Sequence, residues 1–243
     1  MRAERLVLLH GFTQGGGIWL PVIERLTIRC ALDAPDLPGH GASSLLATSL
    51  PETADALVTE FGSAAWVGYS MGGRLALHIA LQHPHRVSHL VLCSTTAGLR
   101  DADERAQRRA NDEKLASRIR EIGTMKFLDE WLAQPLFATL RADRPDAAHD
   151  REVREANLPE GLATSLELAG TGAQASLWEK LPSLTMPVLI VTGELDSKFT
   201  AIGAEMASAI GDNAHHIVMA GCGHSLPFEH PDSFARIVDE FVG

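Results

Sequence analysis

The fold is decided by residues 64–81, whose sequence is AAWVGYSMGGRLALHIAL. Ala65 to Tyr69 is an apolar run of strand length, and Gly72 to Leu81 has the Ala- and Leu-rich spacing of a buried helix. The residues between and around their junction, GYSMG at positions 68–72, match the pattern G-x-S-x-G. In a strand–turn–helix setting this pattern predicts a nucleophile elbow, a sharp turn that exposes the hydroxyl of Ser70.

Other apolar runs repeat the strand pattern on both sides of this segment. They are short runs with apolar centres, each ends in polar or glycine residues, and helix-length segments separate them, which is typical of buried parallel strands in an α/β sandwich. The runs are Arg5 to His10, His89 to Ser94 and Pro187 to Thr192.

The alternation stops between about Leu99 and Leu181, where helical segments follow one another without a strand. We therefore expect a helical cap at residues 99–181, inserted into an α/β core of residues 1–98 and 182–243, in a single folding domain. The first cap segment, residues 99–122, is rich in charges of both signs, and many of these are expected to form a solvated helix face.

The composition excludes several classes of function. The 243 residues include 21 Lys and Arg against 31 Asp and Glu, a net charge of -10 that repels nucleic acids and anionic membranes. No apolar run approaches the roughly 18 residues of a membrane-spanning helix. Arg2, Glu4 and Arg5 lead directly into the first strand without the apolar region of a secretory signal. We expect a cytoplasmic protein with a small-molecule partner and no nucleic acid or membrane partner, and the sequence predicts no oligomeric state.

The cysteines and histidines do not indicate a metal site. Cys30, Cys93 and Cys222 have spacings that fit neither a zinc ribbon nor a redox CxxC motif. The histidines lack ligand spacing with acids or thiols. The sequence therefore predicts reduced, mostly buried thiols, no metal and no cofactor.

A serine at such an elbow needs a base, and the base needs an acid that orients it. Asp196 follows the buried run 188–192, and His224 follows the run 216–219. The order Ser, acid, His along the chain is the one that this architecture requires. Ser70, Asp196 and His224 are therefore the predicted catalytic triad.

The loop after the first strand is the second candidate part of the site. It contains His10-Gly11-Phe12-Thr13 and then Gly15 to Gly17, which would let the backbone approach a ligand. The backbone N–H groups of Phe12 and of Met71, the residue after Ser70, are the candidate oxyanion hole. For the three glycines alone, an ordinary loop is an equally good explanation.

Four motifs together resemble the α/β-hydrolase superfamily. The resemblance covers nearly the whole chain and implies a mostly parallel central sheet flanked by helices, with an inserted helical cap. The motifs are HGFT at 10–13, DLPGHG at 36–41, GYSMGG at 68–73 and the Gly-His pair at 223–224.

Further motifs resemble one family within it, the 2-succinyl-6-hydroxy-2,4-cyclohexadiene-1-carboxylate synthases of menaquinone biosynthesis. Generic esterases do not usually share an arginine directly after the double glycine, an arginine-rich first cap helix and a DSKF segment. The motifs are GYSMGGR at 68–74, GL at 98–99 followed by ERAxR at 104–108, WLAQPLFATL at 131–140 and GELDSKF at 193–199.

This second resemblance implies a lyase that eliminates pyruvate from 2-succinyl-5-enolpyruvyl-6-hydroxy-3-cyclohexene-1-carboxylate. Ser70 would remove the proton next to the succinyl carbonyl, with its basicity raised by His224 and Asp196. The substrate carries three carboxylates, and the arginine fork suits planar carboxylates. The candidate substrate-binding residues are Arg74, one turn along the elbow helix, Arg108 and Arg154 in the cap, Lys198, Tyr69 and Trp131.

Two other functions remain open at this point. A serine hydrolase of esters, thioesters or C–C bonds would use the same triad, with Ser70 as nucleophile. A ligand receptor of the same fold would keep the triad without steady turnover. The lyase hypothesis requires that Arg74, Arg108 and Arg154 converge on the Ser70 hydroxyl.

Overall fold

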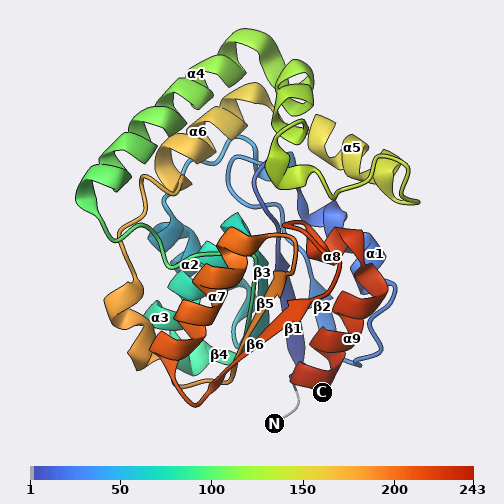
Figure 1. Ribbon diagram of the computed structural model, residues 1–243, viewed down its shortest axis with the longest axis vertical. Helices are drawn as coiled ribbons and strands as arrows, with labels where there is room; N and C mark the ends of the chain where they lie inside the picture. The colour runs from blue at the N-terminus through green and yellow to red at the C-terminus, as the bar shows by residue number, and fades with distance from the viewer. Residues whose placement is uncertain (1–2) are drawn as a thin grey trace.

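A parallel β-sheet forms the centre of the computed structural model, which describes residues 3–243 (Figure 1). The strand order is β2-β1-β3-β4-β5-β6, and each neighbouring pair is parallel. The predicted fold class is confirmed, while residues 1 and 2, including Arg2, lie outside the described part. The strands are β1 (Arg5–Leu9), β2 (Ala31–Asp33), β3 (Ala64–Tyr69), β4 (Val87–Cys93), β5 (Val188–Gly193) and β6 (Ala214–Met219).

Helices cover both faces of this sheet (Figure 1). The α-helices of the core are α1 (Leu20–Ile23), α2 (Leu50–Phe61), α3 (Met71–Gln82), α7 (Ser197–Ile210), α8 (Leu226–Glu229) and α9 (Pro231–Val242). Short 3₁₀-helices lie at η1 (Gly16–Trp19), η2 (Gly41–Ser43) and η3 (Pro84–Arg86).

Successive residues of a strand point to opposite faces, and both faces are buried here. In β1, Val7 and Leu9 pack with residues of α2, α3 and α7, whereas Leu6 and Leu8 pack with residues of α1, α8 and α9. All four side chains are fully buried. Burial on both sides explains why the central strands are continuous apolar runs without polar alternation.

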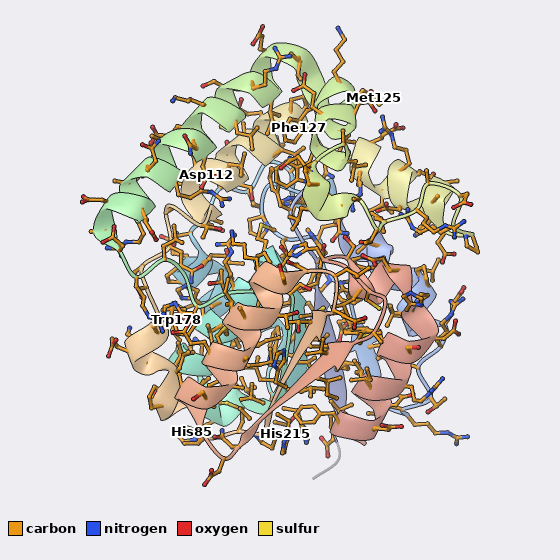
Figure 2. The ribbon with its side chains drawn as sticks, viewed as in Figure 1. His85, Asp112, Met125, Phe127, Trp178 and His215 are labelled. Atoms are coloured by element: carbon orange, nitrogen blue, oxygen red, sulfur yellow. The ribbon has the colours of Figure 1, made fainter. Side chains whose placement is uncertain are left out.

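A set of helices follows β4 and precedes β5 in the sequence, and it covers one end of the sheet (Figure 1). Its own apolar cluster includes Ile119, Phe127 and Leu162. Figure 2 shows Met125 projecting outward from the top of the cap, where its side chain is exposed. The elements are α4 (Ala102–Leu132), η4 (Pro135–Phe137), α5 (Ala147–Glu155), α6 (Pro159–Ala169) and η5 (Trp178–Ser183).

The structure differs from the sequence analysis in one local feature. Strand β2 was not predicted, because its three residues are partly or largely exposed and give no apolar run. In the cap, Gly123 has the non-helical angles φ 75° and ψ 167°, so the first helical segment of α4 ends at Ile122, as the sequence predicts, and a second segment runs on to Leu132. Within the described residues, no helix combines the length and the apolar character needed to cross a membrane.

Gly72 should be irreplaceable for steric reasons. A Cβ at this position would lie 2.1 Å from the carbonyl oxygen of Leu9, a backbone atom in the central sheet. We expect Gly72→Ala to lower the free energy of unfolding by at least about 3 kcal/mol, measured by urea unfolding.

Gly62→Ala is the matched control for that substitution. Gly62 has a left-handed φ of 71°, but a Cβ there meets nothing within 4 Å. The loss should be smaller, about 1 to 2 kcal/mol, and should come from backbone strain alone, because φ 71° and ψ -140° are unfavourable for alanine. Equal losses in the two variants would show that close approach to β1 does not constrain Gly72.

Candidate active site

The turn at Ser70 has the strained geometry of a nucleophile elbow. Ser70 lies between β3 and α3 with φ 52° and ψ -107°, outside the regions that non-glycine residues normally adopt. A Cβ on Gly68 would lie 2.3 Å from the carbonyl oxygen of Gly72, so the turn requires glycine there. From the β4 side, the Ser70 N–H donates to the Cys93 carbonyl at 2.9 Å, and the Thr95 hydroxyl donates to the Ser70 carbonyl at 2.7 Å.

The three residues of the predicted triad lie in one hydrogen-bonded row. His224 Nδ1 donates to Asp196 Oδ2 at 2.7 Å, and the Ser70 hydroxyl donates to His224 Nε2 at 3.2 Å. Asp196 and His224 are buried. The ionised acid fixes the tautomer in which Nε2 can accept the serine proton, so the row can perform general base chemistry.

One cavity of about 180 Å³ contains Ser70 and His224. The two residues of the candidate oxyanion hole, Phe12 and Met71, line the same cavity. The six residues that were predicted to bind substrate also line it: Arg74, Arg108, Arg154, Lys198, Tyr69 and Trp131. The structure therefore places every predicted site residue around this cavity except Asp196, which is buried behind His224.

Arg74 lies on α3 and is only 6% exposed. Its Nη1 donates to Gln174 Oε1 at 3.1 Å, so its hydrogen-bond partner is a neutral amide. Burial and the neighbouring Arg108 lower the pKa of Arg74 to about 10, although Asp112 acts in the opposite direction. The guanidinium is therefore still charged at neutral pH.

Arg108 and Arg154 each bind a buried aspartate one helical turn away. Arg108 Nε donates to Asp112 Oδ1 at 2.8 Å, and Arg154 Nε donates to Asp150 Oδ1 at 2.7 Å. Figure 2 shows Asp112 on the side of α4 that faces α6. Arg154 also donates from Nη1 to the Thr13 hydroxyl at 2.5 Å. Both guanidinium groups are thus held in fixed positions at the cavity.

The remaining predicted residues, Tyr69, Trp131 and Lys198, have other partners around the cavity. The Tyr69 hydroxyl is 3.0 Å from Ser225 Oγ, and burial raises the pKa of Tyr69. Trp131 packs edge-on against Phe12, with ring centroids 5.3 Å apart. Lys198 is exposed, and its Nζ lies 5.7 Å from the ring centroid of Phe199. Its flexible side chain can therefore reach the cavity mouth.

Comparison with known proteins places this architecture in a family. The model of the alpha/beta hydrolase family matches residues 6–237. The chain belongs to the alpha/beta hydrolase family.

Its relatives include 2-succinyl-6-hydroxy-2,4-cyclohexadiene-1-carboxylate synthases. The chain is 34% identical to the synthase of Salmonella schwarzengrund (strain CVM19633), over 97% of this chain and 94% of the relative. A protein of Bacillus subtilis (strain 168) that provisionally carries the same name is 37% identical, over 99% of this chain and 90% of the relative. Among solved structures, MenH from S. aureus superposes with a TM-score of 0.91 at 30% identity, covering 98% of this chain and 93% of that one.

Several residues around the site of this alpha/beta hydrolase were not predicted from the sequence. Asp112 and Asp150 lie four residues from Arg108 and Arg154, a spacing that indicates ion pairs but does not tell which of the acids are buried. Gln174, the partner of Arg74, had no local signal because the two residues are 100 positions apart. Further unpredicted cavity residues are Gln14, Ser94, Thr95, Thr96, Leu136, Phe137, Ser165 and Phe199.

The described residues contain no group of three or more His, Cys, Asp or Glu side chains arranged to hold a metal ion. Two of the histidines have a different, structural role. His10 donates from Nδ1 to the Gly11 carbonyl at 2.8 Å and accepts the Leu37 N–H at Nε2. His40 accepts the Thr13 N–H at Nε2 and donates to the Pro38 carbonyl. Both rings therefore hold the loop that carries Phe12.

These two histidines should make the folded protein sensitive to acid. Burial lowers the pKa of His10 to about 4 and that of His40 to about 3, against 6.5 for an unperturbed histidine. Below pH 6.5 the unfolded chain binds protons that the folded chain does not, so stability is complete above pH 6.5 and falls as the pH drops toward 4. Each histidine contributes a slope of about 1.4 kcal/mol per pH unit in this window.

His40→Gln should remove one of these contributions. We expect the slope of unfolding free energy against pH, measured by urea unfolding between about pH 6 and pH 4.5, to decrease by about 1.4 kcal/mol per unit. His85→Gln is the control, because His85 is exposed (Figure 2). An unchanged slope in His40→Gln would mean that His40 is protonated in the folded protein.

Proposed function

We propose that this enzyme eliminates pyruvate from 2-succinyl-5-enolpyruvyl-6-hydroxy-3-cyclohexene-1-carboxylate and releases 2-succinyl-6-hydroxy-2,4-cyclohexadiene-1-carboxylate. The observation that carries the proposal is the convergence of Arg74, Arg108 and Arg154 on the cavity that contains Ser70. A chain of net charge -10 has a local cluster of cations at this point. Such a cluster suits a substrate with three carboxylates and has no evident purpose for a neutral ester.

The positions of the double bonds define the proton that must leave. The substrate has one ring double bond, at carbon 3, and the product has two, at carbons 2 and 4. Loss of the proton from carbon 2, next to the succinyl carbonyl, forms the first new double bond. The existing double bond then moves to carbon 4, and the carbon–oxygen bond at carbon 5 breaks. The leaving group takes up a proton and becomes pyruvate, so the atoms balance without water.

The triad supplies the base for this first step. Ser70 Oγ accepts the proton from carbon 2 as its own proton passes to His224 Nε2, and Asp196 stabilises the imidazolium that forms. The N–H groups of Phe12 and Met71 stabilise the negative charge that develops on the succinyl carbonyl oxygen. The arginines bind carboxylates and so place carbon 2 against Ser70. No acyl-enzyme intermediate is required.

The proposal also assigns the site residues to two parts of the chain. The insertion at residues 99–181 provides Arg108, Trp131 and Arg154, while residues 1–98 and 182–243 provide the triad. We infer that the polycarboxylate binds between these two parts. A cytoplasmic location remains a prediction of the sequence.

Pyruvate release from the enzymatically generated enolpyruvyl substrate tests the proposal directly. The wild type should release pyruvate, and Ser70→Ala should lose turnover while substrate affinity stays within a few-fold. A short-chain nitrophenyl ester, assayed in parallel, tests the alternative of a serine hydrolase with Ser70 as nucleophile. Ester cleavage without pyruvate release would establish that alternative, and residual pyruvate release above about 10% in Ser70→Ala would exclude Ser70 as the base.

Arg74→Met should weaken binding of the substrate. The Arg74 guanidinium donates to the neutral amide of Gln174, so most of its positive charge is available to attract a carboxylate of the substrate. We expect KM to rise and kcat/KM to lose about 2 kcal/mol of transition-state stabilisation, measured by steady-state kinetics. Arg109→Met is the control, because Arg109 is exposed on α4, pairs with Glu113 and does not line the cavity. An equal change in both variants would place Arg74 outside the binding site.

A further inference from the structure

The carboxylate of Glu229 binds the backbone on both sides of His224. Glu229 ends α8, five residues after His224, and takes no part in the triad. Its Oε2 accepts the Gly223 N–H at 2.8 Å, and its Oε1 accepts the Ser225 N–H at 3.0 Å. The backbone N–H groups of the residues before and after the histidine are therefore held by one side chain.

The inserted segment contacts the same carboxylate. Thr139 lies between η4 and α5, and its hydroxyl donates to Glu229 Oε1 at 2.9 Å. A Cβ on Gly223 would lie 2.0 Å from Thr139 Oγ1, so this approach requires glycine before His224. Two residues earlier, the ring of Phe137 packs edge-on against the His224 ring at 6.2 Å. The segment thus contacts the histidine loop at two points.

We propose that Glu229 is a positioning residue for His224 and that Thr139 holds Glu229 in place from the inserted segment. Asp196 binds only the Nδ1 side of the imidazole, so the distance from Nε2 to Ser70 Oγ depends on where the loop backbone sits. Hydrogen bonds to a carboxylate are stronger than bonds between neutral groups, and Glu229 accepts three of them. A small displacement of a catalytic group is enough to slow a reaction greatly.

The inference rests on the proposed function only in that His224 must be catalytic. It does not depend on whether Ser70 acts as a base or as a nucleophile, since both require the same contact with Nε2. The effect of each variant is therefore expressed as a ratio to the wild type, measured with the substrate that the wild type turns over. Failure to release pyruvate would end the lyase proposal, while the ratio on the nitrophenyl ester would still test Glu229.

Two variants remove the contacts separately. Glu229→Gln leaves one acceptor oxygen for the two flanking N–H groups, and we expect kcat to fall about 10- to 100-fold with KM within about 3-fold. Thr139→Val removes the hydroxyl donor at almost constant volume, and kcat should fall about 5-fold. Thr139→Ser, which keeps the hydroxyl, should restore most of the rate. The low-field proton signal of His224 Nδ1–H should shift in the first two variants, a change that a purely structural role away from the triad would not cause.

Glu194, on the loop between β5 and α7, provides a matched control because its carboxylate also binds the backbone of the His224 loop. Its Oε2 accepts the Gly221 N–H at 2.9 Å, but it is exposed and does not bind a neighbour of His224. Glu194→Gln should leave kcat within about 2-fold of the wild type. Wild-type kcat in Thr139→Val, or an equal loss in Thr139→Val and Thr139→Ser, would overturn the proposal. Thr139→Val decides the question if Glu229→Gln does not fold.

Discussion

The close packing of backbone around Ser70 is the constraint on which the rest of the site depends. A left-handed residue at the end of a buried strand costs of order 1–3 kcal/mol and persists only when its surroundings determine it. Here Gly68 and Gly72 allow α3 to approach β3 and β1, and Cys93 and Thr95 hold the turn from β4. The same turn starts α3, which then presents Met71 and Arg74 to the cavity. One strained turn thus positions the Ser70 hydroxyl, the Met71 N–H and the Arg74 guanidinium.

The charges of the cavity explain how an acidic chain would bind the polycarboxylate of the proposed function. Asp112 pairs with Arg108, and Asp150 lies between Arg154 and Arg144, so each aspartate fixes the direction of one cavity arginine, while the group around Asp150 has two arginines to one carboxylate. Arg74 rests on the neutral amide of Gln174 instead. Burial of a charge without a counter-ion is unfavourable, which is also why the pKa of Arg74 falls. A substrate carboxylate on Arg74 would supply the counter-charge and offset this cost, which favours its binding.

Sequence reasoning succeeded where the signal is local. Apolar runs fixed the central strands, and because parallel strands end at one edge, Asp196 and His224 could be assigned to the neighbourhood of Ser70. The side-chain contacts of the cap could not be predicted from such local signals. Arg108 and Arg109 both have an acid four residues later, yet Asp112 is buried and Glu113 is exposed. Tertiary packing decides the difference, and the mixed charges on every side of α4 hide it.

The helical insertion forms part of the cavity lining as well as a cover over it. Its Arg154 binds the hydroxyl of Thr13, and Asn157 donates to the Thr13 carbonyl at 2.9 Å, which holds that residue at φ 68°. Phe12, whose N–H stabilises the developing negative charge in the proposed mechanism, packs on Trp131 of the same insertion. The insertion that provides Arg108 and Arg154 therefore also holds the loop that carries Phe12. A change of insertion on an unchanged core would alter the lining of the cavity and the position of this loop together.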